Sequence, residues 1–143
     1  MSPRARSVLA LALALAGVAI GVYLTWTHYA GIPPVCVGGV AGCEVVQSSR
    51  FATVGDVPVA AIGVLLYGSI AVLAAAGLRA RTLAPSLVLA TFGAVLAGVL
   101  YSAYLTYLEL FVLGAVCTWC VVSAVVLVAL LAVVAVDLRE ATR

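Results

Sequence analysis

The four cysteines of this chain have types and spacings suited to redox chemistry. Cys117 and Cys120 form a CxxC motif, in the segment CTWC, where a long apolar run begins near the C-terminus. Cys36 and Cys43 lie earlier, in a segment rich in glycine and proline. Thiols in CxxC motifs have lowered pKa values and exchange disulfides readily. The two pairs therefore indicate thiol–disulfide exchange, in which each transfer passes through a mixed disulfide.

The elements expected around the two pairs support a relay between them. The CxxC motif falls at a predicted helix start, where unpaired N–H groups and the positive end of the helix dipole stabilise a thiolate. The Cys36 and Cys43 pair encloses six residues with glycines among them, so a thiol in this segment can move toward the helical pair. One fixed pair and one mobile pair would pass electrons from one to the other.

Two other uses of four cysteines stay open at this point. They could form two structural disulfides in any of three pairings, as is common on oxidising faces. The chain would then be a non-enzymatic four-helix membrane protein. A zinc site is disfavoured because one half has the wrong spacing and no histidine assists, so we expect no metal. Static bridges are the weaker hypothesis, because a CxxC bridge closes only a small loop and joins no second element.

Composition places the chain in the membrane. Of its 143 residues 66% are hydrophobic and only 8% are charged, with a mean hydropathy of +1.32. Four apolar runs are close to the ~20 residues that a helix needs to cross a bilayer. Backbone groups in lipid must be satisfied internally, so these runs should be helices. We expect a single all-α membrane domain over residues 1–143, with transmembrane helices at about 7–27, 58–78, 85–107 and 115–136.

The segment at about 29–57 is the long connection of this four-helix bundle, and a connection of this length is more often functional than idle. The stretch CEVVQSSRF within it has helical character. We expect a cap loop that carries a short helix over the mouth of the bundle. Arg50 is a candidate partner for Glu44 or for a thiolate in this cap.

Arginine placement predicts the orientation. Only Arg50 lies in the cap loop, and the other six arginines flank the opposite helix ends. Cytoplasmic segments carry the excess of positive charge. Both termini should therefore be cytoplasmic, with all four cysteines on the outer, oxidising side. The net charge of +2 is too small and too scattered to suggest nucleic acid. The six arginines are Arg4, Arg6, Arg79, Arg81, Arg139 and Arg143.

Several motifs in one order resemble the vitamin K epoxide reductase family. Cys36 and Cys43 are followed by SSRF at 48–51, PVAAIGVLLYG at 58–68 and LFVLGAVCTWC at 110–120. The pattern is similar to a bacterial-type homologue without a fused thioredoxin-like domain. The related DsbB family has the reverse order, with its CxxC motif in the first outer loop, and is therefore disfavoured.

The resemblance implies a thiol–quinone oxidoreductase of the bacterial plasma membrane that supports disulfide-bond formation. Its partner would be a separate thioredoxin-like (DsbA-like) protein, and its quinone of the menaquinone, ubiquinone or vitamin K type. By position, Cys36 would exchange with the partner and Cys43 would pass electrons to Cys117. Cys120 would then meet the quinone.

Residues beside the quinone are expected from the same resemblance and from burial. Ser49 matches the family's serine near the active site. Val59 and Ala124 stand where the vertebrate enzymes have an asparagine and a tyrosine, so quinone binding here should rest on apolar packing or other donors. Tyr101 and Tyr104 lie deep in the 85–107 run, where a hydroxyl needs a partner, so one of them is expected to face the quinone.

Three further residues near the cysteines are interpreted first as structural. Glu109 should mark the outer boundary of the 85–107 helix, and a role in proton uptake is the less favoured alternative. Trp119 should pack against lipid or the cap, where excluding water would also tune thiol reactivity. Tyr107 fits an aromatic belt at the membrane interface.

Overall fold

The computed structural model describes residues 1–36, 40–80 and 84–143, and within these ranges the chain is predominantly helical. Two short strands form an antiparallel pair in which Thr53 is opposite Pro58. In chain order the elements are α1 (Pro3–Ala30), α2 (Val40–Ser48), the 3₁₀ turn η1 (Arg50–Ala52), β1 (Thr53–Val54), β2 (Val57–Pro58), α3 (Val59–Arg79), α4 (Pro85–Leu108), the π-helical segment η2 (Glu109–Leu113) and α5 (Thr118–Ala141).

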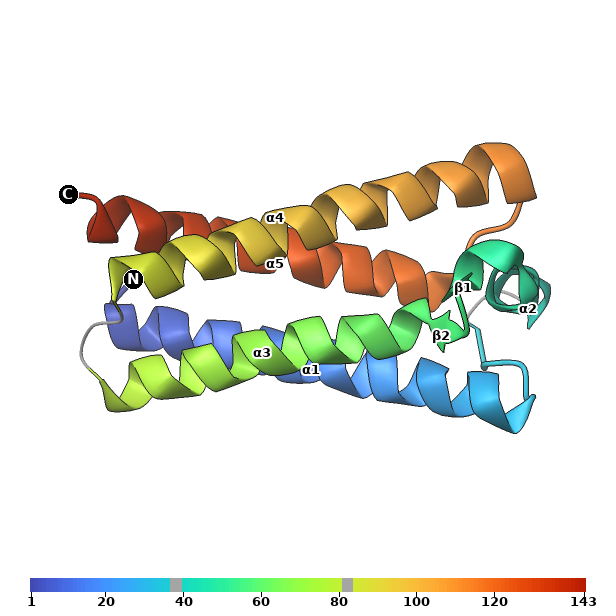
Figure 1. Ribbon diagram of the computed structural model, residues 1–143, viewed down its shortest axis with the longest axis horizontal. Coiled ribbons are helices and arrows are strands. Elements are labelled where there is room, and N and C mark those ends of the chain that lie inside the picture. The colour runs from blue at the N-terminus through green and yellow to red at the C-terminus, as the bar shows by residue number, and fades with distance from the viewer. Residues whose placement is uncertain (37–39, 81–83) are drawn as a thin grey trace.

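Four long helices form an elongated bundle (Figure 1), with both termini at one end and α2 at the other. The helices α1, α3, α4 with η2, and α5 are each long and apolar enough to cross a membrane. The protein is therefore a multi-pass membrane protein, and the predicted all-α class with a short helix in the cap loop is confirmed.

The helix ends differ from the predicted ranges for local reasons. Helix α1 starts before residue 7 because the Ser2 hydroxyl accepts a hydrogen bond from the Ala5 amide, at 3.2 Å, and Pro3 occupies the first turn. Helix α5 starts after residue 115 because Gly114 takes a left-handed conformation, with φ of 63°, and Cys117 is still extended. The signals at Ser2 and Gly114 lie outside the apolar runs that predicted the spans.

Small residues let α1 and α3 approach closely. A side chain on Gly17 would overlap the ring of Tyr67, and one on Gly21 would lie 2.7 Å from Val64 Cγ2. The hydroxyl of Tyr67 donates to the carbonyl of Ser123 on α5 at 2.9 Å. The GxxxG spacing in α1 therefore serves packing inside the bundle.

An ion-pair cluster joins α1 and α5 at the end that carries the termini. Arg6 is buried, and its Nε donates to Asp137 at 2.6 Å while a second guanidinium nitrogen donates to Glu140. Pairing of this kind offsets the free-energy cost of burying the Arg6 charge. Arg81, one of the arginines used for orientation, lies outside the described residues.

Candidate functional site

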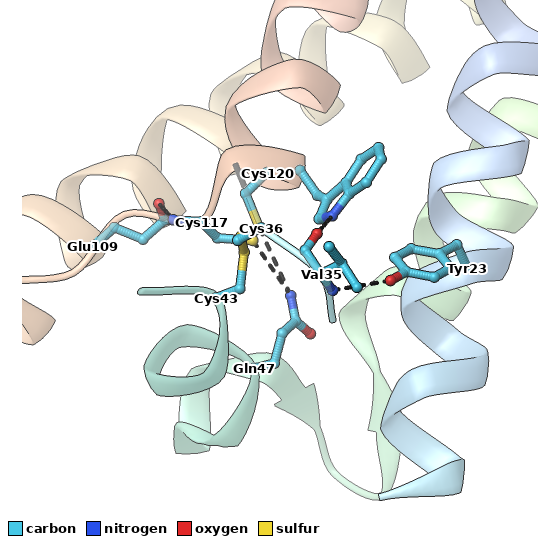
Figure 2. The surroundings of a disulfide bond; sticks show 9 residues. Tyr23, Val35, Cys36, Cys43, Gln47, Glu109, Cys117 and Cys120 are labelled. Carbon is cyan, nitrogen blue, oxygen red and sulfur yellow. Dashed lines mark hydrogen bonds between the residues drawn. A yellow bond between two sulfur atoms is a disulfide. The ribbon is translucent and has the colours of Figure 1, made fainter. Parts of the chain in front are cut away.

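The two cysteine pairs meet where the cap lies on the start of α5 (Figure 2). Cys36 and Cys43 form a disulfide, and Cys117 and Cys120 are free thiols. The sulfur atoms of Cys36, Cys43 and Cys117 all lie within 4.8 Å of one another. Two of these sulfurs share a bond and are not thiolate ligands, so the cluster in this state favours exchange over metal binding.

The four cysteines differ in access. Cys43 and Cys117 are 0% exposed, whereas Cys36 and Cys120 are partly exposed. A contact between Cys43 and Cys117 is therefore closed to solvent. Of the loop pair, Cys36 is the sulfur that an external thiol can reach.

Gly42 sets the distance between α2 and the segment before α5. A Cβ at this position would lie only 2.6 Å from the carbonyl oxygen of Val116. The absence of a side chain lets the backbone of α2 rest directly on this segment. As a result the neighbouring residues Cys43 and Cys117 are brought together.

Gln47 faces both free thiols from α2 (Figure 2). Its Nε2 lies 3.9 Å from the sulfur of Cys117 and 3.9 Å from that of Cys120. This residue was not predicted from the sequence. Its position four residues after Cys43 would have placed it on the same helix face, which is the signal that could have identified it.

Glu109 is a second residue whose contact with the CxxC motif was not predicted from the sequence. It does lie at the end of α4, as predicted, but its side chain is only 3% exposed. Its carboxylate accepts a hydrogen bond of 3.2 Å from the Cys117 amide. Its backbone carbonyl accepts hydrogen bonds from the amides of Gly114 and Ala115. Glu109 thus holds the turn that leads into the CxxC motif.

The environment of Cys117 favours its thiolate. The pKa of this thiol is lowered from its ordinary value of 9.0 to about 7, mainly by a hydrogen bond with Cys120, with a further contribution from Gln47. Burial and the nearby Glu109 carboxylate oppose the shift. Cys117 is also the N-cap of α5, and its carbonyl accepts from the Val121 amide at 3.1 Å. Cys117 is therefore more acidic than an ordinary cysteine, and its thiolate is the form that reacts in disulfide exchange.

Trp119 fixes the chain just before Cys36. Its indole N–H donates to the carbonyl of Val35 at 2.7 Å, and the Val35 amide donates to the Tyr23 hydroxyl at 3.0 Å. The rings of Trp119 and Tyr23 lie 5.4 Å apart. Of the two surroundings predicted for Trp119, the contact here is with the cap. The loop pair is tied in this way to both α1 and α5.

A cavity of about 460 Å³ opens inside the bundle next to the cysteines. Most of its wall is made of aliphatic residues from α1, α3, α4 and α5, and Cys120 is part of that wall. The volume and the apolar lining with few polar groups are typical of small-molecule sites. The polar side chains that reach it include Gln47, Ser49, Tyr67, Tyr101, Glu109 and Ser123.

Some of the predicted quinone-contact residues line this cavity and others do not. Ser49, Val59 and Tyr101 line it, whereas Tyr104 and Ala124 are not among its lining residues. The ring of Tyr104 is half-exposed and lies 6.2 Å from that of Tyr101. The hydroxyl of Ser49 donates to the Val46 carbonyl at 2.7 Å. Arg50, predicted to pair with Glu44 or a thiolate, lies over the Phe51 ring, 5.0 Å from its centre.

Comparison with known families agrees with this arrangement. The sequence model of the Vitamin K epoxide reductase family matches residues 8–135. The chain belongs to this family. The protein is therefore a membrane thiol oxidoreductase, and its disulfide beside two further cysteines fits that chemistry. Vitamin K epoxide reductase family members act with quinones and generally work with thioredoxin-like redox partners.

The residues of this family member fit a quinone. The cavity offers an apolar enclosure for a flat ring, and the Cys120 thiol stands in its wall. Hydroxyl groups from Tyr67 and Ser123 occupy the same lining and lie 2.9 Å apart. An apolar site with a thiol and a small number of hydroxyls can bind a quinone ring and present an electron donor to it.

Proposed function

We propose that this protein takes electrons from a thioredoxin-like partner at Cys36 and Cys43, transfers them to Cys117 and Cys120, and reduces a quinone in the cavity. Its physiological role would be disulfide-bond formation. One observation carries this proposal. Cys120 belongs to the CxxC pair that contacts the loop disulfide and is also part of the cavity wall.

The first step is exchange at the exposed end of the loop disulfide. A thiolate of the partner attacks the Cys36 sulfur, the bond to Cys43 breaks, and Cys43 leaves as a thiolate. The partner's second thiol then displaces Cys36, which oxidises the partner and reduces the loop pair. The partial exposure of Cys36 and the complete burial of Cys43 support this order of attack.

The second step moves the electrons inward. Cys43 attacks Cys117 of an oxidised CxxC pair, and Cys120 leaves as a thiolate. Cys36 then attacks Cys43, which restores the loop disulfide and releases Cys117 as a thiol. The outcome is an oxidised loop pair beside a reduced helical pair, which is the redox state of this structure.

In the third step the Cys117 and Cys120 thiols become a disulfide and give up two electrons and two protons. A quinone in the cavity would accept the two electrons and the two protons and would leave as the hydroquinone. Cys120 would be the electron donor because it stands in the cavity wall, to which Val59 also contributes. Ser49 and Tyr101 are the lining residues proposed to orient the quinone.

Placement in the membrane follows from the arginines. We propose a bacterial plasma membrane location with both termini in the cytoplasm and all four cysteines outside. Arg4, Arg79 and Arg143 lie at helix ends or a terminus on the side away from the cap, in support of this orientation. A periplasmic or other extracytoplasmic protein would then be the thiol donor.

Steady-state turnover tests the function. The purified protein, supplied with dithiothreitol as electron donor and a soluble short-chain ubiquinone or menadione, should form hydroquinone catalytically. Cys120→Ser should abolish this turnover. If the wild-type protein leaves the quinone unchanged and its helical thiols persist, the structural-disulfide alternative replaces the enzyme.

The partner half of the proposal has a separate test. Cys36→Ser should lose oxidation of a reduced thioredoxin-like protein and retain oxidation of dithiothreitol, because only the small dithiol can reach the inner sulfurs. Equal loss with both donors would contradict the role of Cys36.

A further inference from the structure

Glu109 is a buried carboxylate at a position where packing alone does not explain an acidic residue. It is 3% exposed and lines the cavity, yet its neighbours provide no positively charged partner among the described residues. The Cys117 amide donates a hydrogen bond to it, and the Cys120 thiol is its other interaction partner in the cavity wall. A buried carboxylate without a cation costs free energy, so a neutral amide or an apolar residue would serve packing better.

The local backbone is built around this side chain. Glu109 begins the π-helical segment η2, which ends at the left-handed Gly114. Single π-helical turns of this kind are frequent at functional sites. The wide turn directs the carboxylate back to the start of α5, where it reaches Cys117.

We propose that Glu109 carries the proton of Cys120 during quinone reduction, an inference that rests on the proposed function above. The Cys120 thiol gives its proton to the Glu109 carboxylate, and the electron pair stays on sulfur. As the Cys117–Cys120 bond forms, two electrons pass to the quinone. Glu109 returns its proton to a quinone oxygen, and the second proton comes from the Cys117 thiol or, where that thiol is already ionised, from water. Two thiols and a quinone thus give one disulfide and one hydroquinone.

The charged and titratable neighbours allow this role. Among the described titratable groups, the carboxylate interacts with the Cys120 thiol directly and with the Cys117 thiol through charge alone. Helix α2 packs on the same segment and contributes the neutral Gln47, while its Glu44 is exposed. Tyr67 and Tyr101 line the same cavity. The Cys120 thiol and the Glu109 carboxylate therefore border the cavity in which the quinone ring is proposed to bind.

The test compares Glu109→Gln with Glu109→Asp and with the control Glu44→Gln, which removes an exposed carboxylate from the cap. Glutamine keeps a carbonyl acceptor for the Cys117 amide but cannot hold a proton. Quinone reduction by reduced Glu109→Gln should therefore slow by about 10²-fold. Aspartate should recover part of the rate, and Glu44→Gln should match the wild type.

A second readout needs no quinone. In protein stripped of quinone and with Cys36, Cys43 and Cys117 replaced by serine, iodoacetamide reports on Cys120 alone. Loss of the adjacent negative charge should make Cys120 alkylation reach its plateau at lower pH in Glu109→Gln. A thiol that is easier to ionise, combined with slower quinone reduction, is the result expected for a proton carrier.

The remaining outcomes overturn the inference. Wild-type quinone reduction in Glu109→Gln would show that no proton passes through this carboxylate. Parallel loss of Cys120 alkylation and quinone reduction would show that Glu109 only maintains the fold of the site. Failure of the wild-type protein itself to reduce quinone would instead reject the proposed function, so the two failures are distinct.

Discussion

The sulfur atoms of Cys43 and Cys117 lie within 4.8 Å of each other, and both side chains are completely buried. A disulfide bond is about 2 Å long, so an approach of at most roughly 3 Å would join them. The two residues come from α2 and from the N-cap of α5, elements far apart in the sequence. This contact connects the two cysteine pairs without exposing the exchange to water.

Replacing Cys120 should trap this contact. In Cys120→Ser the Cys117 thiolate has no partner in its own helix, so it attacks Cys43, and Cys36 is released as a free thiol. Peptide mapping under non-reducing conditions should find a Cys43–Cys117 bridge. A Cys36–Cys117 bridge would contradict the assigned order. Cys117→Ser is the control, because it removes the attacking thiol.

Gly42→Ala should slow electron transfer between the cysteine pairs by increasing the distance between Cys43 and Cys117. The added methyl group would meet the Val116 carbonyl oxygen at 2.6 Å, so α2 must move away from the start of α5. We expect transfer from dithiothreitol to quinone to fall about tenfold or more, consistent with the rate losses that follow small misplacements of reacting groups.

Gly93→Ala is the matched control for this change. Nothing lies within 4 Å of a side chain at that position in α4. The substitution should leave turnover unchanged and stabilise the protein by about 0.4–1 kcal/mol. Equal turnover in both alanine variants would show that the close contact at Gly42 is not required.

The reactivity of Cys117 should depend on pH with a midpoint near neutrality. Its native pKa of about 7 lies below the ordinary 9.0, so the thiolate persists down to about pH 7 and is protonated below it. With Cys120 retained, the fraction of Cys117 present as thiolate should fall about tenfold per pH unit below that midpoint and level off above it. Stopped-flow measurement of thiolate absorbance, with Cys117→Ser as the blank, checks the midpoint. A midpoint near 9 would contradict the stabilisation of this thiolate.

The cysteine pairs and the spans followed from the sequence because each has a local signal. The spacing of Cys117 and Cys120 predicts a reactive pair, and apolar runs of sufficient length predict membrane helices. Gln47 was not predicted as a site residue, and for Glu109 a place at the helix boundary was favoured over a role in proton uptake. Their contacts depend on the π-helical turn and on the way α2 lies across α5, and neither feature has a periodicity that a single sequence reveals.

The cavity illustrates the same limit. Ser49, Val59 and Tyr101 reach it, but so do Tyr67 and Ser123, neither of which was predicted as a site residue. Their hydroxyls meet only because Gly17 lets the ring of Tyr67 enter the bundle between α1 and α5. Such a cavity is a product of side-chain packing among four helices, whereas sequence patterns describe one helix at a time.

Orientation gives a prediction that is independent of catalysis. A membrane-impermeant maleimide applied to intact cells after mild reduction should label Cys36, the accessible cysteine of the cap. A cysteine introduced in place of Arg143, in a background with Cys36→Ser, should react only after the membrane is opened. The reverse pattern would place the cap in the cytoplasm and remove the relay from the oxidising compartment.

Single-turnover quinone reduction by the helical pair alone tests the central claim most directly. The double variant Cys36→Ser/Cys43→Ser keeps only Cys117 and Cys120, so after reduction and removal of dithiothreitol it can supply electrons from no other thiol. Mixed with a soluble quinone, it should form one hydroquinone per protein as both thiols are lost, and adding Cys120→Ser should abolish the reaction. Retention of both thiols in the double variant, or undiminished hydroquinone formation without Cys120, would contradict electron transfer from this cysteine to a quinone in the cavity.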